Sequence, residues 1–153
     1  MDNNMLFREA EETDVDEVVK MLANDPLGKT RENYIHPLPD QYLKAFEAIR
    51  SDPNNELIVA VWENQIIGVL QITFTPYITH QGGWRATIEG VRTSEYVRGK
   101  GVGTNMITWA IERAKTRNCH LVQLTTDKTR KDALRFYEKL GFQATHEGLK
   151  LKL

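Results

Sequence analysis

The most informative segment of the chain reads Thr87-Ile88-Glu89-Gly90-Val91-Arg92-Thr93-Ser94-Glu95-Tyr96-Val97-Arg98-Gly99-Lys100-Gly101-Val102-Gly103-Thr104. Its first half alternates apolar and polar residues, which is typical of a strand. Its second half places three glycines within five residues, directly before an apolar pattern of helical spacing that starts at Val102. Glycine backbones reach conformations that other residues avoid, and they leave room for a close ligand. We therefore predict a strand, a tight glycine-rich turn and the start of a helix.

This turn is suited to bind an anion. The first N–H groups of a helix have no partner within the helix, and the positive end of the helix dipole lies beside them. Arg98 adds a full positive charge, and Lys100 is either a second contact or a solvated charge. Phosphate or diphosphate fits such a turn best. The Walker pattern fails because Thr104 follows the last glycine where Lys is required, and the Gly-x-Gly-x-x-Gly fingerprint fails because its last position holds Thr104 or Met106.

Hydrophobic periodicity predicts the elements on both sides of this segment. Strands are expected at residues 6–10, 57–62, 66–74, 84–93, 121–124, 142–145 and 149–151, with a hairpin turn at 63–65. Helices are expected from a capping pair, Thr13 and Asp16, to Leu22, then from Pro39 to Ile49, and over 102–114 and 131–140. The pattern predicts an α/β (α+β) fold: a mixed sheet of six or seven strands flanked by helices, in one domain over residues 1–153.

Composition excludes several classes of protein. With 153 residues, 41% hydrophobic and 27% charged, the chain has the profile of one ordinary globular domain. Its 20 basic and 21 acidic residues argue against a surface that binds nucleic acid. Apolar runs far shorter than the ~20 residues that cross a bilayer argue against a membrane anchor. A lone Cys119 and four scattered histidines argue against a disulfide or a metal site. No secretory leader is visible, so we expect a cytoplasmic protein.

The pattern Arg98-x-x-Gly101-x-Gly103 at a strand-to-helix junction resembles the acyl-CoA signature of the GNAT superfamily of N-acetyltransferases. Ile88-Glu89 resembles the start of that family's fourth strand, and the segment from Ala133 to Phe142, with its Tyr-Glu-Lys-Leu-Gly-Phe ending, resembles its last helix and following strand. The matched core runs from about Thr87 to Phe142. Two positions depart from the family pattern: Arg130 stands where an Asn often contacts the cofactor, and Val97 where a Tyr usually precedes the Arg-Gly pair.

The resemblance implies acetyl-CoA as donor and a primary amine, of a small molecule or a peptide, as acceptor, in one direct transfer. It implies that Glu89 acts as the base, directly or through a water, and that Tyr137 protonates the departing thiolate. Val91 is the expected position of the backbone N–H that stabilises the oxyanion. The cofactor is expected to contact Val91, Arg92, Thr93, Arg98, Gly99, Lys100, Gly101, Val102, Gly103 and Thr104. The sheet should splay beside Val91. A homodimer is a further expectation, which rests on the resemblance to the family alone.

Other interpretations stay open. Glu89 can be a solvated strand carboxylate, and Tyr137 a core or rim tyrosine. The acceptor pocket is expected around Tyr34 and His36 and in the loop that holds Tyr77, His80 and Trp84. The first rival function is a CoA-binding module of the same fold that regulates or docks a partner without efficient catalysis. The second is a regulatory protein that touches DNA, which no basic helix supports.

Overall fold

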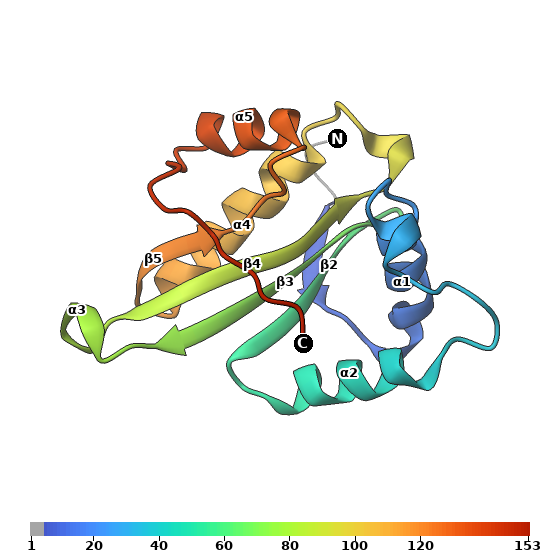
Figure 1. Cartoon of the computed structure of the whole chain (residues 1–153). Coiled ribbons are helices and arrows are strands. Elements are labelled where there is room, and N and C mark those ends of the chain that lie inside the picture. The colour runs from blue at the N-terminus through green and yellow to red at the C-terminus, as the bar shows by residue number, and fades with distance from the viewer. Residues whose placement is uncertain (1–4) are drawn as a thin grey trace. The chain divides into compact units, whose positions relative to one another are not determined.

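The structure is a computed structural model that describes residues 5–153. Its sheet has five strands in the order β1-β2-β3-β4-β5. The strands are β1 (Leu6–Glu9), β2 (Asn55–Trp62), β3 (Gln65–Pro76), β4 (Trp84–Thr93) and β5 (Cys119–Leu124). The first four pair antiparallel, whereas α4 (Val102–Thr116) crosses from β4 to β5, the kind of connection that joins parallel neighbours. The predicted mixed α/β sheet is confirmed (Figure 1).

The remaining helices are α1 (Val15–Ala23), α2 (Asp40–Ser51), α3 (Thr79–Gly82) and α5 (Lys131–Lys139), with 3-10 turns at Glu12–Asp14, Gly28–Thr30 and Glu95–Val97. The chain divides into two compact units, Met1–Gln123 and Leu124–Leu153, and each is described by itself. The expectation of one domain over residues 1–153 stays a prediction.

The predicted number of strands was too high. Residues 142–145 and 149–151 are not strands, so the described part of the chain forms five strands instead of six or seven. Apolar alternation cannot make a strand alone, because its N–H and C=O groups need a neighbouring strand to bond. Leu149 and Leu151 are 95% and 86% exposed, and no strand partner covers them in this unit.

The predicted capping pair, Thr13 and Asp16, was also wrong. The pair that forms lies two residues earlier, where Asp14 accepts a hydrogen bond from the N–H of Glu11 at 2.7 Å. Asp14 additionally accepts two hydrogen bonds from Arg8, at 2.5 Å and 3.1 Å. This second partner comes from β1, so tertiary contact favours the earlier start over the local alternative.

Helix α4 packs on one face of the sheet, and α1 and α2 pack on the other (Figure 1). On the α4 side, Met106, Ile107 and Ala110 are fully buried, and α4 packs against β3 and β4. On the other side, the core gathers Val15, Val18, Val19, Met21, Phe46, Val59 and Val69. Apolar side chains thus line the α4 face and part of the other face, where α1 covers only one end of β3 and β4 (Figure 1).

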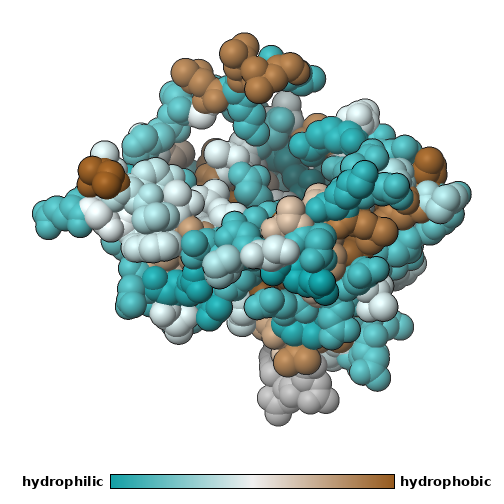
Figure 2. All heavy atoms as spheres, turned by 90° about the horizontal axis from the view of Figure 1, so that it is seen from below, coloured by the Kyte–Doolittle hydropathy of each residue, from teal (hydrophilic) through white to brown (hydrophobic). Residues whose placement is uncertain are grey.

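Hydrophilic side chains cover most of the surface seen in Figure 2, and several groups of hydrophobic side chains lie between them. Helix α2 fits this pattern, since Phe46 is its single buried residue. Among residues 5–153, no helix combines the length and the apolar character needed to cross a membrane.

Candidate active site around strand β4

The glycine-rich turn has the backbone that the sequence predicts. Gly99 and Gly101 have φ of +74° and +78°, in the left-handed region that only glycine occupies at little cost. A Cβ at either position would meet no atom within 4 Å, so the space in front of the turn is open. Arg98 and Lys100 are exposed beside it, and α4 begins at Val102. The turn therefore presents helix N–H groups and positive charge to one open space.

The other residues of this turn that are predicted to contact the cofactor differ in how deeply they are buried. The Val102 side chain is 1% exposed and belongs to the core, so only its backbone can reach a ligand. Thr104 is exposed and Gly103 half-buried in the first turn of α4. Their hydrogen-bonding groups lie at the helix end that the anion would occupy.

Strand β4 carries an irregularity at the position expected for the oxyanion donor. Val69 pairs with Arg92, and Gln71 pairs with Glu89, so Gly90 and Val91 together face Leu70. Two residues opposite one define a β-bulge, which takes backbone groups out of the ladder. Gly90 has φ of +61°, and a Cβ there would come no closer than 4.0 Å, to Leu22 of α1. The bulge places the Val91 backbone where the regular ladder is interrupted, while its role toward an oxyanion stays a prediction.

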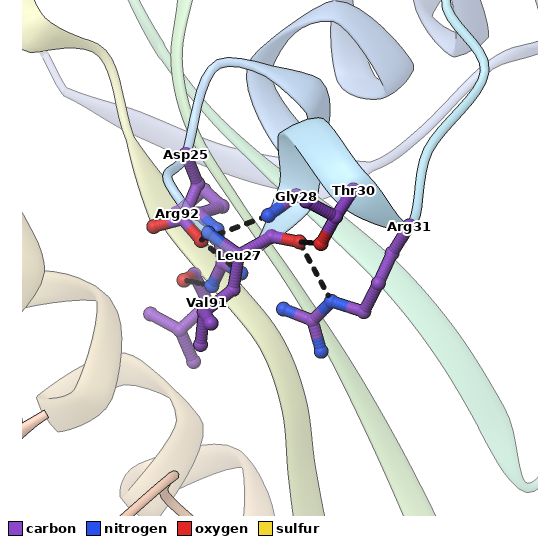
Figure 3. Close-up of polar contacts among 7 residues, drawn as sticks. All are labelled: Asp25, Leu27, Gly28, Thr30, Arg31, Val91 and Arg92. Carbon is purple, nitrogen blue, oxygen red and sulfur yellow. Dashed lines mark hydrogen bonds and ion pairs between the residues drawn. The ribbon is translucent and has the colours of Figure 1, made fainter. Parts of the chain in front are cut away.

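The end of β4 is tied to the loop that follows α1, a contact that the sequence did not indicate (Figure 3). Arg92 Nη2 lies 3.3 Å from Asp25 Oδ2, and Arg92 Nη1 donates to the Val91 carbonyl at 2.7 Å. Asp25 is 7% exposed and also accepts hydrogen bonds from the N–H groups of Leu27 and Gly28. The Arg92 side chain therefore holds this loop, while its contact with a cofactor stays a prediction. Only a tertiary structure pairs residues so far apart in sequence.

A hollow of about 130 Å³ lies between the end of α1 and the segment after β4. Its lining includes Lys20, Asp25, Arg92, Tyr96 and Arg98. Arg98, which is predicted to bind an anion, therefore lines the same hollow as Asp25 and Arg92, the two residues that hold the loop after α1. A larger hollow, about 410 Å³, lies by Trp109 and Glu56 and holds none of the predicted site residues.

Glu89 is exposed and stands one residue before the bulge, opposite Gln71 of β3. Thr87 lies on the same side of β4, because side chains two residues apart in a strand share a face. The Thr87 hydroxyl accepts a hydrogen bond from the Gln123 amide at 3.1 Å, which joins β4 to β5 on this face. The predicted base is thus set in a polar sheet face beside the bulge.

Tyr137 belongs to the second unit. It lies on α5, half-buried between Phe136 and Phe142, with ring centroids at 5.1 Å and 5.8 Å. The helix ends at Lys139, and the predicted Gly141 follows two residues later with a φ of +92°. Arg130 precedes this helix and is also half-buried. The acid role of Tyr137 stays a prediction.

The acceptor candidates fall into two groups. Tyr34 donates a hydrogen bond to Asp16 at 3.0 Å, and His36 lies 3.6 Å from the same carboxylate. Loss of solvent and the bond to Asp16 raise the pKa of the Tyr34 hydroxyl. At the far end of the β3–β4 hairpin, His80 stacks on His120, and Tyr77 lies under Arg85.

Comparison with known proteins gives the following similarities. The sequence model described as the acetyltransferase (GNAT) family matches residues 21–142. An aminoalkylphosphonate N-acetyltransferase of Salmonella typhimurium is 28% identical over 101 residues, 66% of this chain and 65% of that protein. A glucosamine 6-phosphate N-acetyltransferase of Trypanosoma brucei brucei is 34% identical over 89 residues, 58% of each chain. The chain thus spans less than two thirds of the length of these curated relatives.

Two crystal structures are similar over nearly the whole chain. A protein of Bacillus halodurans C-125 described as a transcriptional regulator is 60% identical, with a TM-score of 0.95 over 97% of this chain and 99% of its own. A predicted acetyltransferase of Clostridium acetobutylicum, described with acetyl-CoA, is 27% identical, with a TM-score of 0.74 over 97% and 96% of the two chains.

Proposed function

This chain belongs to the acetyltransferase (GNAT) family, and on that premise we propose that it transfers the acetyl group of acetyl-CoA directly to a primary amine. The observation that carries the proposal is the combination of a bulge on β4 with the glycine turn that follows this strand. The bulge at Gly90–Val91 interrupts the ladder of β4, and the left-handed Gly99 and Gly101 shape the turn that follows it. The first offers a backbone donor, and the second offers a place for a diphosphate.

The residues present fit coenzyme A. Open space in front of Gly99 and Gly101 would admit a diphosphate against the first N–H groups of α4. Arg98, exposed beside the turn, would neutralise part of its charge. Backbone groups from Val91 to Thr93 would pair with the amide-rich pantetheine arm as an added strand does. When bound, acetyl-CoA supplies the activated acetyl thioester.

The amine must lose a proton before it attacks, because a free alkylammonium has a pKa near ~10. Glu89 would take that proton, directly or through a water. The Val91 N–H would hold the negative charge that develops on the carbonyl oxygen. Tyr137 would deliver a proton to the departing sulfur.

The binding half of the proposal is tested with Arg98→Glu. Charge reversal beside a diphosphate should abolish CoA binding in isothermal titration calorimetry. Arg50→Glu is the matched control, because Arg50 is an exposed helical arginine of α2 in the same unit. If Arg98→Glu bound CoA as the wild type does, the assignment of the diphosphate site would fail.

The catalytic half is tested with Glu89→Gln and Tyr137→Phe. Each should lower kcat by about 100-fold or more while CoA affinity stays the same. The loss in Glu89→Gln should shrink as pH rises toward the pKa of the amine, since a neutral amine needs no base. If a variant had the same kcat as the wild type at saturating substrate, the proposed catalytic role of the substituted residue would be excluded.

The acceptor is best sought in a panel of amines with detection of the released thiol. Aminoalkylphosphonates and glucosamine 6-phosphate come first, because two curated relatives are named for them. A CoA-binding module without catalysis, the rival function, would bind CoA and release no thiol with any amine.

A DNA-binding role is the second candidate, because the similar Bacillus halodurans protein is described as a transcriptional regulator. The near balance of basic and acidic residues does not favour it. A gel shift that weakens steeply with salt would support it.

The proposal also includes a cytoplasmic location and a homodimer. Fluorescence microscopy would test the location, and analytical ultracentrifugation would test the homodimer.

A further inference from the structure

One face of the β3–β4 hairpin is polar where α1 no longer covers it. Helix α1 lies near β4 at Gly90, where an added Cβ would come within 4.0 Å of Leu22, and the hairpin continues beyond it toward α3 (Figure 1). Along this uncovered part the side chains on one side of β4 are Arg85, Thr87 and Glu89. Such residues in the middle of a sheet need either solvent or a ligand.

The strand register extends this polar face sideways. Glu89, Thr87 and Arg85 stand directly opposite Gln71, Thr73 and Thr75 of β3. The Gln71 amide donates to Asn55 of β2 at 2.9 Å, and the Gln123 amide of β5 donates to Thr87. The face therefore crosses four strands and offers amides and hydroxyls, with a carboxylate near the bulge and a guanidinium at the far end.

The charge at that far end has no carboxylate partner. In the described part of the chain no ion pair involves Arg85, whose guanidinium lies 4.5 Å above the ring of Tyr77. Its Nε is buried and has no hydrogen-bond partner. A buried donor without a partner costs free energy unless something binds it. An arginine fork matches a carboxylate or phosphoryl group well.

We propose that the acceptor amine carries an anionic group, which binds Arg85 while its amino group lies at Glu89. The inference rests on the proposed acetyl transfer, and it names the substrate class of that same site. Four residues of strand separate the two side chains, about 13 Å between Cα atoms at ~3.3 Å per residue. The Arg85 guanidinium lies over Tyr77 and would have to turn toward Thr87 to meet the ligand, so that a short molecule with its amine and its anion at opposite ends reaches both side chains.

The test compares amines of equal length and opposite far-end charge. Probes are 4-aminobutyrate and 1,4-diaminobutane, with O-phosphoethanolamine to distinguish a phosphoryl from a carboxylate group. Wild type should acetylate an anionic probe with the higher kcat/KM. Arg85→Gln should lower that value by about 10- to 100-fold and leave 1,4-diaminobutane within twofold. Arg85→Lys should keep part of the preference, and Arg85→Glu should reverse it.

Arg117→Gln is the matched control, since Arg117 also lies 4.5 Å over a ring, that of Phe74, in the same unit. It should keep the wild-type preference. Equilibrium binding of the two anionic probes to the protein with CoA gives a second readout, and Arg85→Gln should weaken it equally. Circular dichroism confirms that each variant folds.

The outcomes separate the two proposals. Thiol release with every amine, without preference for the anionic probes, overturns this inference and leaves acetyl transfer standing. An equal loss for all amines in Arg85→Gln overturns it too. Binding of CoA with no thiol released from any amine overturns both.

Discussion

The two faces of the β3–β4 hairpin differ although they share the same strands and the same register. On the α4 side, Leu70, Ile72, Phe74, Ala86 and Ile88 are 0–2% exposed and meet a helix along their length. On the other side, Gln71, Thr73, Arg85, Thr87 and Glu89 alternate with them and remain half-buried or exposed. Consecutive residues therefore have opposite environments.

The difference shows that one face of the hairpin provides stability, whereas the other carries the polar residues proposed for catalysis. Apolar burial on the closed face holds the strands in register, since buried aliphatic side chains supply most of the folding free energy. The open face can then keep polar side chains that would weaken a core. The bulge at Gly90–Val91 lies at the border, where α1 stops covering the open face. Four predictions test or sharpen this contrast.

The largest effect should come from the closed face. Ile72 is 0% exposed, and Ile72→Ala should reduce the free energy of unfolding by about 3 kcal/mol, because it leaves a cavity. Thr73→Ala, its neighbour on the open face, should cost under about 1 kcal/mol. Urea denaturation measures both. Similar losses at the two positions would contradict the contrast between the faces.

The bulge should matter more for turnover than for stability. Gly90→Ala places a side chain at a φ of +61° without a close contact, so strain alone should cost about 1 kcal/mol. It should lower kcat by about tenfold or more, because the Val91 N–H moves. Gly82→Ala, at φ +76° with nothing within 4 Å, controls for strain and should leave kcat unchanged.

Helix α1, which covers one end of the open face, is fastened partly by charge. The hydrogen bond from Arg8, opposed by burial, holds the pKa of Asp14 below its usual range. The contribution of this pair to the free energy of unfolding is fully present above the pKa of Asp in the unfolded chain, near ~3.9. It is lost as pH falls through the lower pKa that Asp14 has in the folded protein. Arg8→Met should cost about 1 kcal/mol at pH 7, and the difference from wild type should shrink below about pH 4.

Unfolding by urea from pH 2 to 7 measures that difference. Arg50→Met is the control, because the ion pair of Arg50 with Glu47 is exposed and should add almost nothing at any pH. A difference between wild type and Arg8→Met that stays constant down to pH 2 would contradict the assignment.

The smallest effect is expected at Cys119, at the start of β5. Burial raises the pKa of this thiol, and Arg117 opposes the rise only in part. The thiol should therefore react slowly with a disulfide reagent at pH 7.5 and quickly in urea. Cys119→Ser should change kcat by less than twofold. A fast native reaction or a tenfold loss would show that this cysteine has a role at the site.

Much of this could be predicted from the sequence. The hairpin of β2 and β3 forms as predicted, and Glu63 and Asn64 turn it with φ of 50° and 61°. The glycine turn and the start of α4 at Val102 were also predicted, because glycine spacing and helical periodicity are local signals. The predictions of the last two strands and of the capping pair were wrong. A strand needs a neighbouring strand to pair with, and Asp14 accepts hydrogen bonds from Arg8 of β1, which local sequence does not reveal.

The alternation of polar residues in β3 and β4 was visible in the sequence, but their assembly into one face was not. A single sequence shows which residues share a side of their own strand, whereas the register between strands decides which residues meet. The link between Asp25 and Arg92 is of the same kind.

The order of amino acids by itself determined the strand, the turn and the helix start from Thr87 to Thr104, because those features depend on the backbone preferences of neighbouring residues. Only the tertiary structure placed the bulge opposite Leu70, brought Asp25 to Arg92, and left Arg85 without a carboxylate among the described residues. Those outcomes depend on which distant segments pack together, and burial and pairing across the sheet are properties of the folded chain.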